Sequence, residues 1–216
     1  MKTNSVLDGQ YEIQTFRTVD LTEKQFSSVV EQIKEMYLWF APDSTENDMH
    51  ERLRQHKEAC IDVLIRADTG ECCGFSVYYT EQFGEKRIMF RGGTIVRDRS
   101  RGLYKELLHH SVSPEEQDFV VAMTQNPRVY EALRSLSARG IAYPAHEIKN
   151  PEEIKIIAQA FCKAPGLNPE SMIVPEVYGS IRKDQEFKLV KDHSVEKFFA
   201  DNLGVDDGFL VVVPLH

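Results

Sequence analysis

The pattern of hydrophobic and polar positions divides the chain into short alternating runs and longer segments with helical spacing. Residues 11–19, YEIQTFRTV, alternate and are rich in β-branched and aromatic residues, which is typical of a half-buried strand. Residues 20–40 follow as a predicted helix, whose start Thr22 or Asp20 can cap. Its apolar stripe consists of Phe26, Val29, Val30, Ile33, Met36 and Tyr37. The charged segment 46–58 that comes next also has a helical pattern.

Three more strands are predicted before the next helix, joined by turns at TGE and FGEK. They lie at residues 59–68, 72–83 and 87–96. Gly92 and Gly93 stand inside the third of these strands, which indicates a bulge. A pair of glycines that only relieves crowding within the strand fits the sequence equally well.

The second half of the chain alternates between helical and strand patterns. Helices are predicted at 101–112, 126–140, 151–164 and 193–204, and strands at 118–124 and 208–215. Pro127 suits the start of its helix and Gly140 its end. Leu103, Leu107 and Leu108 form the buried stripe of the first of these helices. Residues 166–191 show no clear pattern.

This order of elements predicts a mixed α/β fold, with a central mixed sheet flanked by helices and both meander and crossover connections. With 216 residues, 42 % of them hydrophobic, the chain can bury a sizeable core. We expect residues 1–216 to form a single domain. Its core is expected at about 11–143, and 146–216 as a helix-rich extension that returns a final strand to the sheet.

Charge and cysteine usage narrow the class of partner. A formal net charge of −8 argues against general nucleic-acid binding, which depends on neutralising phosphates. No apolar run approaches the ~20 residues that would span a bilayer, and the N-terminus lacks the apolar core of a secretory signal. The four cysteines, Cys60, Cys72, Cys73 and Cys162, form no CxxC pair, so we expect reduced thiols and a cytoplasmic protein. No metal site is expected, because the adjacent His109 and His110 have no partner at ligand spacing.

The segment 92–111, GGTIVRDRSRGLYKELLHHS, joins an apolar run to a helix through three arginines in five residues: Arg97, Arg99 and Arg101. A helix N-terminus presents free N–H groups and the positive end of its dipole, so it can hold a phosphate. Gly102 would let the backbone approach closely, Ser100 can add a hydroxyl donor, and the arginines can add charge-assisted bonds. A plain solvated turn is the alternative interpretation.

The stretch RSRGLYKELL, Arg99–Leu108, resembles the acetyl-CoA motif of the GCN5-related N-acetyltransferase (GNAT) superfamily. That motif is an Arg or Gln, two residues, Gly, one residue, then Gly or Ala, opening a helix; here Arg99, Gly102 and Tyr104 take those places. The element order from 11 to about 143 also resembles the family. Tyr104 departs from the motif by replacing a small residue. A register that puts Arg101 first spoils the leucine stripe of the helix.

The resemblance implies a GNAT-like acyl-CoA acyltransferase fold and an N-acetyltransferase that moves an acetyl group from acetyl-CoA directly to a primary amine of a small molecule or peptide. It implies that the backbones of Thr94, Ile95 and Val96 pair with the pantetheine arm. The phosphates would lie at Arg99, Ser100, Arg101 and Gly102, beside the first helical residues Leu103 and Tyr104. Asn126 would also contact the cofactor, although it could cap its helix instead.

The general acid is the least defined part of the expected site. The family pattern places a Tyr seven residues after the Asn, where this chain has Leu133. Tyr130 lies on the same helical face and is the candidate acid, with a packing role as the alternative. No spacing selects a general base among Glu81, Glu85 and Arg91, which lie near the expected substrate cleft. A non-catalytic GNAT-like module that binds acyl-CoA or a protein is therefore a second hypothesis, and a homodimer stays open.

Overall fold

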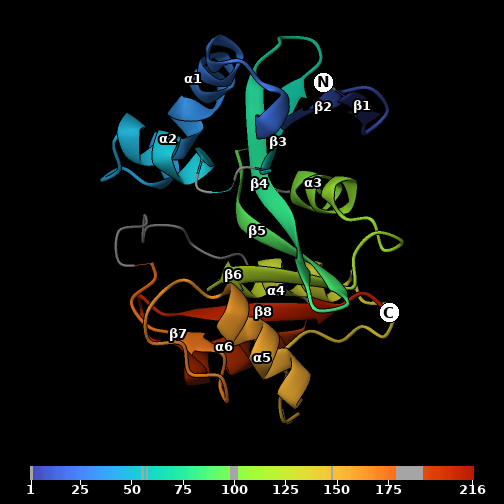
Figure 1. Ribbon diagram of the computed structural model, residues 1–216, viewed down its shortest axis with the longest axis vertical. Coiled ribbons are helices and arrows are strands. Elements are labelled where there is room, and N and C mark those ends of the chain that lie inside the picture. Colours follow the sequence, from blue (N-terminus) through green and yellow to red (C-terminus); the bar gives the residue numbers. More distant parts are fainter. Residues whose placement is uncertain (1, 55, 57, 98–101, 147, 179–191) are drawn as a thin grey trace. The chain divides into compact units, whose positions relative to one another are not determined.

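The computed structural model describes residues 2–54, 56, 58–97, 102–146, 148–178 and 192–216 (Figure 1). The chain divides into two compact units. The first unit contains Met1–Thr80 and Arg91–Val112, and the second contains Glu81–Phe90 and Ser113–His216. The chain therefore passes from one unit to the other inside two strands as well as after a helix.

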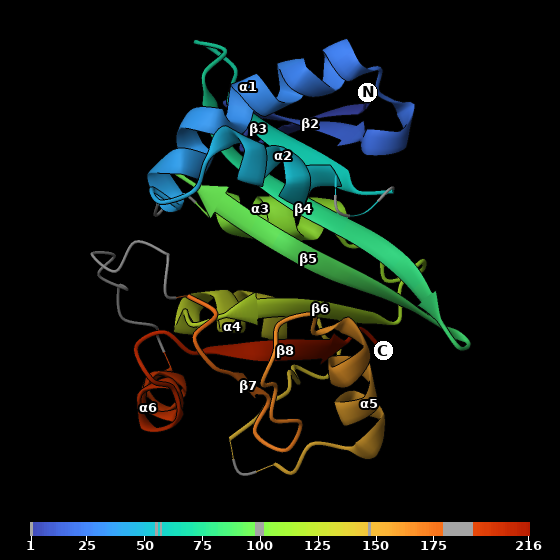
Figure 2. The same cartoon turned by 60° about the vertical axis from the view of Figure 1, so that its left-hand side comes forward.

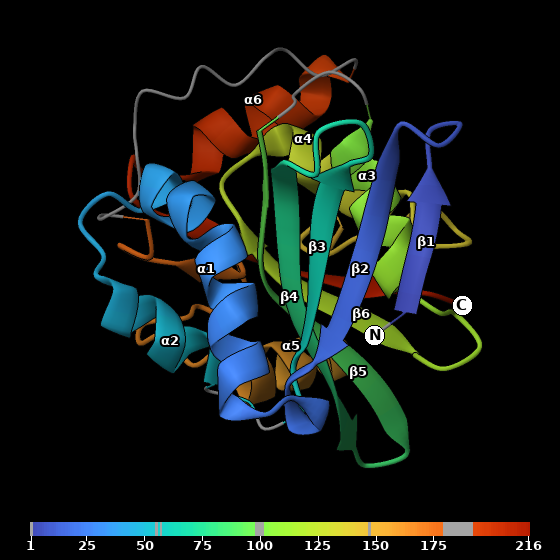
Figure 3. The same cartoon turned by 90° about the horizontal axis from the view of Figure 1, so that it is seen from above.

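The first unit is an antiparallel meander with three α-helices. Its strands, in the order β1-β2-β3-β4-β5, are β1 (Lys2–Val6), β2 (Tyr11–Arg17), β3 (Cys60–Arg66), β4 (Cys72–Phe83) and β5 (Lys86–Val96). The first unit contains β4 up to Thr80 and β5 from Arg91 onward. The helices are α1 (Glu23–Phe40), α2 (Glu46–Arg54) and α3 (Leu103–Ser111), and a short 3-10 turn, η1, spans Thr18–Asp20. Strands β1 to β4 lie side by side in Figure 3, and the pairs β1–β2, β2–β3 and β3–β4 are antiparallel.

Successive residues of a strand point to opposite faces, and this alternation gives the first unit two separate cores. On one face, the buried side chains of α1 and α2 pack with Ile61 and Val63 of β3 and Phe75 of β4. On the other face, Leu103 and Leu107 of α3 pack with Leu64 of β3 and with residues of β2. The leucine stripe predicted for α3 is therefore what holds this helix on the sheet.

Helix α1 begins where the sequence pattern predicts a cap. The Thr22 hydroxyl accepts a hydrogen bond from the Gln25 N–H, and the Gln25 side chain accepts one from the Thr22 N–H. This capping box satisfies two donors that the first turn would otherwise leave free. Of the two predicted caps, Thr22 is thus the one that is used, while Asp20 lies in η1.

The second unit is built on the antiparallel pair of β6 (Phe119–Thr124) and β8 (Gly208–Pro214), with the short β7 (Ile173–Val174) beside β8 (Figure 2). The last residues of β4, from Glu81, and the first residues of β5, up to Phe90, also belong to this unit, and its strand order is β4-β5-β6-β8-β7. Its helices are α4 (Pro127–Arg134), α5 (Glu152–Phe161) and α6 (His193–Asn202). Aromatic rings of α4, α6 and β8 stack or meet edge to face: Tyr130, Phe198, Phe199 and Phe209.

The predicted mixed α/β class is confirmed, and the final strand joins the sheet between β6 and β7 as expected. Two strands were missed: β1, whose sequence KTNSV carries mostly polar residues, and β7, which is only two residues long. The helix predicted to end at Gly140 stops at Arg134, because the chain turns at Ser135 and Gly140 closes a later turn with φ 65°. Residues 179–191 of the segment without a pattern lie outside the described residues. The division into two units does not fall near residue 146, and a single domain stays a prediction.

Candidate functional site

The arginine-rich loop divides into a part that the structure describes and a part that it does not. Arg97 pairs with two carboxylates: its Nη1 lies 3.0 Å from Glu71 Oε1, and its Nη2 lies 3.0 Å from Glu35 Oε1. The carboxylates of Glu35 on α1 and Glu71 before β4 therefore neutralise the charge of Arg97. The sequence could not show these ion pairs, because the two glutamates are distant from Arg97 along the chain. Arg99, Ser100 and Arg101, predicted to hold phosphates, lie outside the described residues.

Gly102 caps the N-terminus of α3 in a conformation that favours glycine. Its φ of 77° and ψ of 0° lie in the left-handed region, and an added Cβ would meet no atom of the described residues within 4 Å. The Gly102 carbonyl accepts bonds from the Lys105 and Glu106 N–H groups, so the first turn is well formed. An exposed glycine at the positive end of a helix dipole leaves open space for an anion at the backbone. The described residues here therefore fit the phosphates of an acyl-CoA.

The side chains of the predicted pantetheine-pairing residues all have structural roles. Ile95 packs into the core beneath α1, and Val96 packs on the opposite face with the residues that α3 covers. The Thr94 hydroxyl accepts a hydrogen bond from Arg91 at 2.6 Å. Only the backbone of these residues is left for a ligand, as expected, and its role in binding stays a prediction.

The glycine pair lies inside β5, which is continuous over Lys86–Val96, and does not relieve crowding. A Cβ at Gly93 would meet nothing within 4 Å, and one at Gly92 would meet only the Val77 carbonyl oxygen at an ordinary 3.6 Å. In a regular strand, residues three apart point to opposite faces. Because the side chains of Arg91 and Thr94 bond to each other, the alternation must be broken between them. The interruption thus lies at the glycines where a bulge is predicted.

Arg91 does not lie in a substrate cleft; it is buried beneath α3 with 4 % exposure. Its Nη2 donates to Ser76 Oγ at 2.9 Å and to Thr94 Oγ1 at 2.6 Å, and its Nη1 donates to Ser111 Oγ at the end of α3. The charge of Arg91 also acts on the Tyr104 hydroxyl, so these two side chains lie near each other inside the first unit. Burial raises the pKa of Tyr104, although the positive charge of Arg91 opposes this shift.

A buried carboxylate lies in the same interior. Asp62 Oδ1 accepts hydrogen bonds from Thr15 Oγ1 at 2.8 Å and Tyr78 Oη at 3.3 Å, and it lies 3.9 Å from His110 Nε2. Its other oxygen, Oδ2, is buried without a partner among the described residues. Burial raises the pKa of Asp62, against the opposing effects of the Thr15 bond and of His110 and Arg91. Sequence reasoning missed this polar cluster because its members come from four strands and one helix.

The predicted catalytic tyrosine is tied to the backbone of the second unit. Tyr130 is 3 % exposed, and its hydroxyl proton is shared between the carbonyl oxygens of Ala142 at 3.0 Å and Pro144 at 2.9 Å. Burial raises its pKa to about 12. Leu133, at the position of the family tyrosine, is fully buried. In this arrangement Tyr130 anchors the segment 142–144, and its role as an acid stays a prediction.

Asn126 serves as the N-cap of α4, where its Oδ1 accepts a hydrogen bond from the Arg128 N–H at 2.9 Å. His109 is exposed, whereas His110 contacts Thr15 at 2.9 Å and Asn4 at 3.1 Å. Within the described part of the chain no group of three His, Cys, Asp or Glu side chains could hold a metal ion. No helix there is long and apolar enough to cross a membrane.

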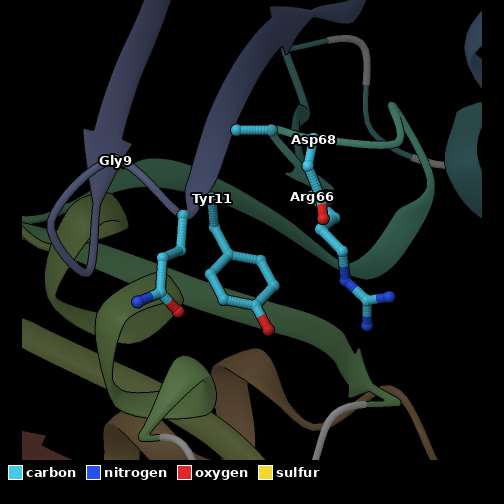
Figure 4. A pocket seen from close by; sticks show the side chains of 6 residues that line it. Gly9, Tyr11, Arg66 and Asp68 are labelled. Carbon is cyan, nitrogen blue, oxygen red and sulfur yellow. The ribbon is translucent and has the colours of Figure 1, made fainter.

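A surface pocket opens in the first unit at the β1–β2 turn and the end of β3 (Figure 4). Tyr11 and Arg66 pair across β2 and β3, and their side chains project to the same side of the sheet. The other lining residues are Gly9, Gln10, Ala67 and Asp68. Of the residues predicted to bind a cofactor, none of those that the structure describes lines this pocket.

No protein-family model and no curated protein matches the chain. Among solved structures it is similar to a GNAT family acetyltransferase from Staphylococcus aureus, with 23 % identity over 46 % of this chain and 74 % of the other, at a TM-score of 0.35. It is also similar to the NatC complex bound to Gag peptide and CoA, with 14 % identity over 94 % of this chain and 99 % of the other, at 0.46. An aminoglycoside 6'-acetyltransferase type Ii shares 11 % identity over 94 % and 97 %, at 0.47. These similarities concern the fold of the chain.

Proposed function

We propose that this chain is an acetyl-CoA-dependent N-acetyltransferase of the GNAT type, acting on a primary amine of a small molecule or peptide. The observation that carries the proposal is the start of α3: a left-handed, exposed Gly102 opens the helix directly after the arginine-rich loop that follows β5. The residues around that glycine resemble the acetyl-CoA motif, and a glycine at a helix N-terminus lets a phosphate approach the backbone N–H groups closely, which supports the proposal.

Each part of the proposed site has a defined task. The first N–H groups of α3 hold the phosphates, and Arg99 and Arg101 add charge-assisted bonds to them. The backbone of Thr94, Ile95 and Val96 hydrogen-bonds the pantetheine arm. When bound, acetyl-CoA supplies the thioester from which the acetyl group leaves. The acceptor must arrive as a free amine, because a protonated amine has no lone pair with which to attack. The net charge of −8 favours the approach of cationic acceptors.

The test is a calorimetric titration of acetyl-CoA into the parent chain and into a variant in which Arg99 and Arg101 are both alanine. Binding to the parent that weakens in the variant, by about tenfold or more for two lost charge-assisted contacts, supports the phosphate site. A screen of amines for thiol release from acetyl-CoA then tests turnover. A folded parent that binds no acyl-CoA would contradict the proposal.

A non-catalytic acyl-CoA-binding module is the second candidate, and the environment of Tyr130 favours it. The hydroxyl that would protonate the leaving thiolate is shared between two backbone carbonyls, and Leu133 replaces the family tyrosine. Saturable binding of acetyl-CoA without thiol release across small amines, polyamines and peptides would favour this module over the enzyme.

A further inference from the structure

Arg91, Ser76 and Thr94 form a closed triangle of side-chain contacts beneath α3. Arg91 Nη2 donates to Ser76 Oγ at 2.9 Å and to Thr94 Oγ1 at 2.6 Å, and the two hydroxyl oxygens lie 3.0 Å from each other. The other terminal nitrogen, Nη1, donates to Ser111 Oγ at the end of α3. Arg91 and Ser76 are buried, with 4 % and 0 % exposure. Directed bonds to a buried guanidinium fix its orientation, so the triangle fixes where Thr94 stands relative to Arg91.

The triangle closes across the glycine pair of β5. Arg91 and Thr94 flank Gly92 and Gly93, and their side chains meet on one face of the sheet, although a regular strand would place them on opposite faces. One extra residue at a bulge shifts the register of the residues that follow it in this way. Glycine adopts many backbone conformations, and the register of glycine-rich strands is weakly specified. The glycines therefore permit the bulge but do not select it.

The register after the bulge decides which backbone groups β5 presents to a ligand. The Arg97 N–H donates to a carbonyl oxygen of β4 at 2.8 Å, and the Ile95 carbonyl oxygen lies 3.0 Å from the position of a Cβ at Gly74 of β4. Ile95 and Arg97 thus direct their backbone groups toward β4. Because alternate residues of an antiparallel strand direct these groups to opposite edges, Thr94 and Val96 direct theirs to the edge away from β4. Without the bulge, the two sets of residues would exchange edges.

We propose that Arg91, Ser76 and the Thr94 hydroxyl position β5: they hold its bulge in the register in which the N–H and C=O groups of Thr94 and Val96 face the pantetheine arm of acetyl-CoA. This inference rests on the proposed function. It narrows the residues that bond the arm to Thr94 and Val96, since Ile95 faces β4. The side chains of the triangle do not touch the thioester; they act through the backbone of β5.

Thr94→Val tests the proposal because it removes one hydroxyl and keeps a β-branched side chain. It leaves a buried N–H of Arg91 without its acceptor and opens the triangle. We expect the dissociation constant for acetyl-CoA to rise about tenfold, the effect of losing one hydrogen bond to a charged group. Phosphoadenosine diphosphate, the nucleotide part of CoA without the arm, should bind as it does to the parent. Without ligand, the amides of Gly92 and Gly93 should exchange with solvent faster than in the parent.

The matched control is Thr15→Val. Thr15 lies on β2 in the same unit, and its hydroxyl also bonds to a buried charged group, because it donates to Asp62 Oδ1 at 2.8 Å. The same chemical change there should destabilise the first unit by a similar amount. It should leave the affinity for acetyl-CoA and the exchange of Gly92 and Gly93 as in the parent.

Two further measurements support the test. Ser76→Ala removes the second acceptor of Arg91 Nη2 from β4, so it should reproduce the effect of Thr94→Val and decides the question if that variant does not fold. In the parent, saturating acetyl-CoA should slow the amide exchange of Val96 and leave that of Ile95 unchanged.

The outcomes separate this inference from the function on which it rests. A parent that binds acetyl-CoA beside a folded Thr94→Val variant of equal affinity would overturn the positioning role and leave the proposed function intact. An equal loss of affinity for acetyl-CoA and phosphoadenosine diphosphate, or an equal loss in Thr15→Val, would also overturn it, since the effect would not pass through β5. Protection of Ile95 in place of Val96 would contradict the assignment of edges and with it the inference. A parent that binds neither ligand would remove the proposed function and this inference together.

Discussion

At the scale of single residues, Asp62 is a group whose protonation state the fold disturbs. The carboxyl group is fully buried on β3, and one of its two oxygens has no partner among the described residues. Thr15, Tyr78, His110 and Arg91 face it from β2, β4, α3 and β5. These groups favour the carboxylate, yet burial outweighs them and the pKa in the folded protein is raised.

The raised pKa of Asp62 predicts how stability depends on pH. In the unfolded chain the carboxyl group has a pKa of about 4, and in the folded protein its pKa is higher. The group therefore stabilises the folded protein at a pH below the unfolded pKa, and this stabilisation is lost as the pH rises through the folded pKa. Asp62→Asn has no such titration. As the pH rises from about 4, the parent should therefore lose stability relative to the variant. The difference between their free energies of unfolding should change by about 1.4 kcal/mol for each unit by which the folded pKa is raised. Urea unfolding of both proteins between pH 4 and 7 measures this, and a constant difference would show that Asp62 does not titrate as described.

Tyr130 gives a second prediction at this scale. Replacing it with phenylalanine leaves the carbonyls of Ala142 and Pro144 without the donor that they share in a buried site. We expect the free energy of unfolding to fall by about 1–3 kcal/mol, the cost of unsatisfied buried acceptors. Urea unfolding measures this loss. If Tyr130 is also the general acid, turnover at saturating acetyl-CoA should fall by about 10²-fold or more at a temperature where the variant is fully folded. Unchanged turnover would restrict Tyr130 to its structural role.

At the scale of the element, the start of α3 combines a strained backbone position with the proposed function. An L-residue in the left-handed region costs about 1–2 kcal/mol, so Gly102→Ala should destabilise the first unit by that amount. It should also weaken acetyl-CoA binding, because relief of the strain moves the first turn of the helix. Urea unfolding and calorimetric titration measure the two effects separately.

Gly140→Ala provides the matched control for that variant. Gly140 has φ 65° and, like Gly102, no atom within 4 Å of an added Cβ, but it lies in a turn of the second unit. The two variants should lose similar stability, and only Gly102→Ala should lose affinity for acetyl-CoA. An equal loss of affinity in both would mean that general destabilisation, not the geometry of α3, controls binding.

The sequence predicted an element well where residues near one another along the chain define it. Strand β4 was predicted with the bounds that the structure has, 72–83, because a period of two and the turns on both sides define it locally. Strand β1 was missed because its polar residues pair at the edge of the sheet, so its pattern carries no buried face. Helix α4 was extended too far because Gly140 was taken as its end, whereas Ser135 already turns the chain.

The candidate site shows the same limit more strongly. Gly102 was singled out from a motif of adjacent residues; the structure shows it left-handed at the start of α3, and its role in binding stays a prediction. The Arg91 cluster could not be predicted, because Ser76, Thr94 and Ser111 come together only after β4, β5 and α3 have packed. The break in alternation at the glycine pair also reverses the face on which Arg91 would be expected in a regular strand.

At the scale of the whole molecule, the path of the chain links the folding of the two units. It passes from one unit to the other between Thr80 and Glu81 in β4, between Phe90 and Arg91 in β5, and again after Val112. Two of these passages lie inside strands that are neighbours in the sheet order and not in linkers. If one unit unfolded alone, β4 and β5 would each have to lose their pairing over only part of their length. Partial loss of a shared pair of strands is unfavourable, because the remaining half loses the neighbours that stabilise it.

We therefore expect residues 1–216 to unfold in one cooperative transition. Trp39 is the only tryptophan and lies on α1, so its fluorescence reports on the first unit. Far-ultraviolet circular dichroism reports on the helices and strands of both units. In urea, the two signals should give the same midpoint and the same slope, as two-state unfolding requires. A tryptophan placed at exposed Val205 of the second unit, with Trp39 replaced by Phe, supplies the reciprocal probe and should give that midpoint too. If the midpoints differ between the two tryptophan probes, the units are separate domains, and the continuity of β4 and β5 does not couple them.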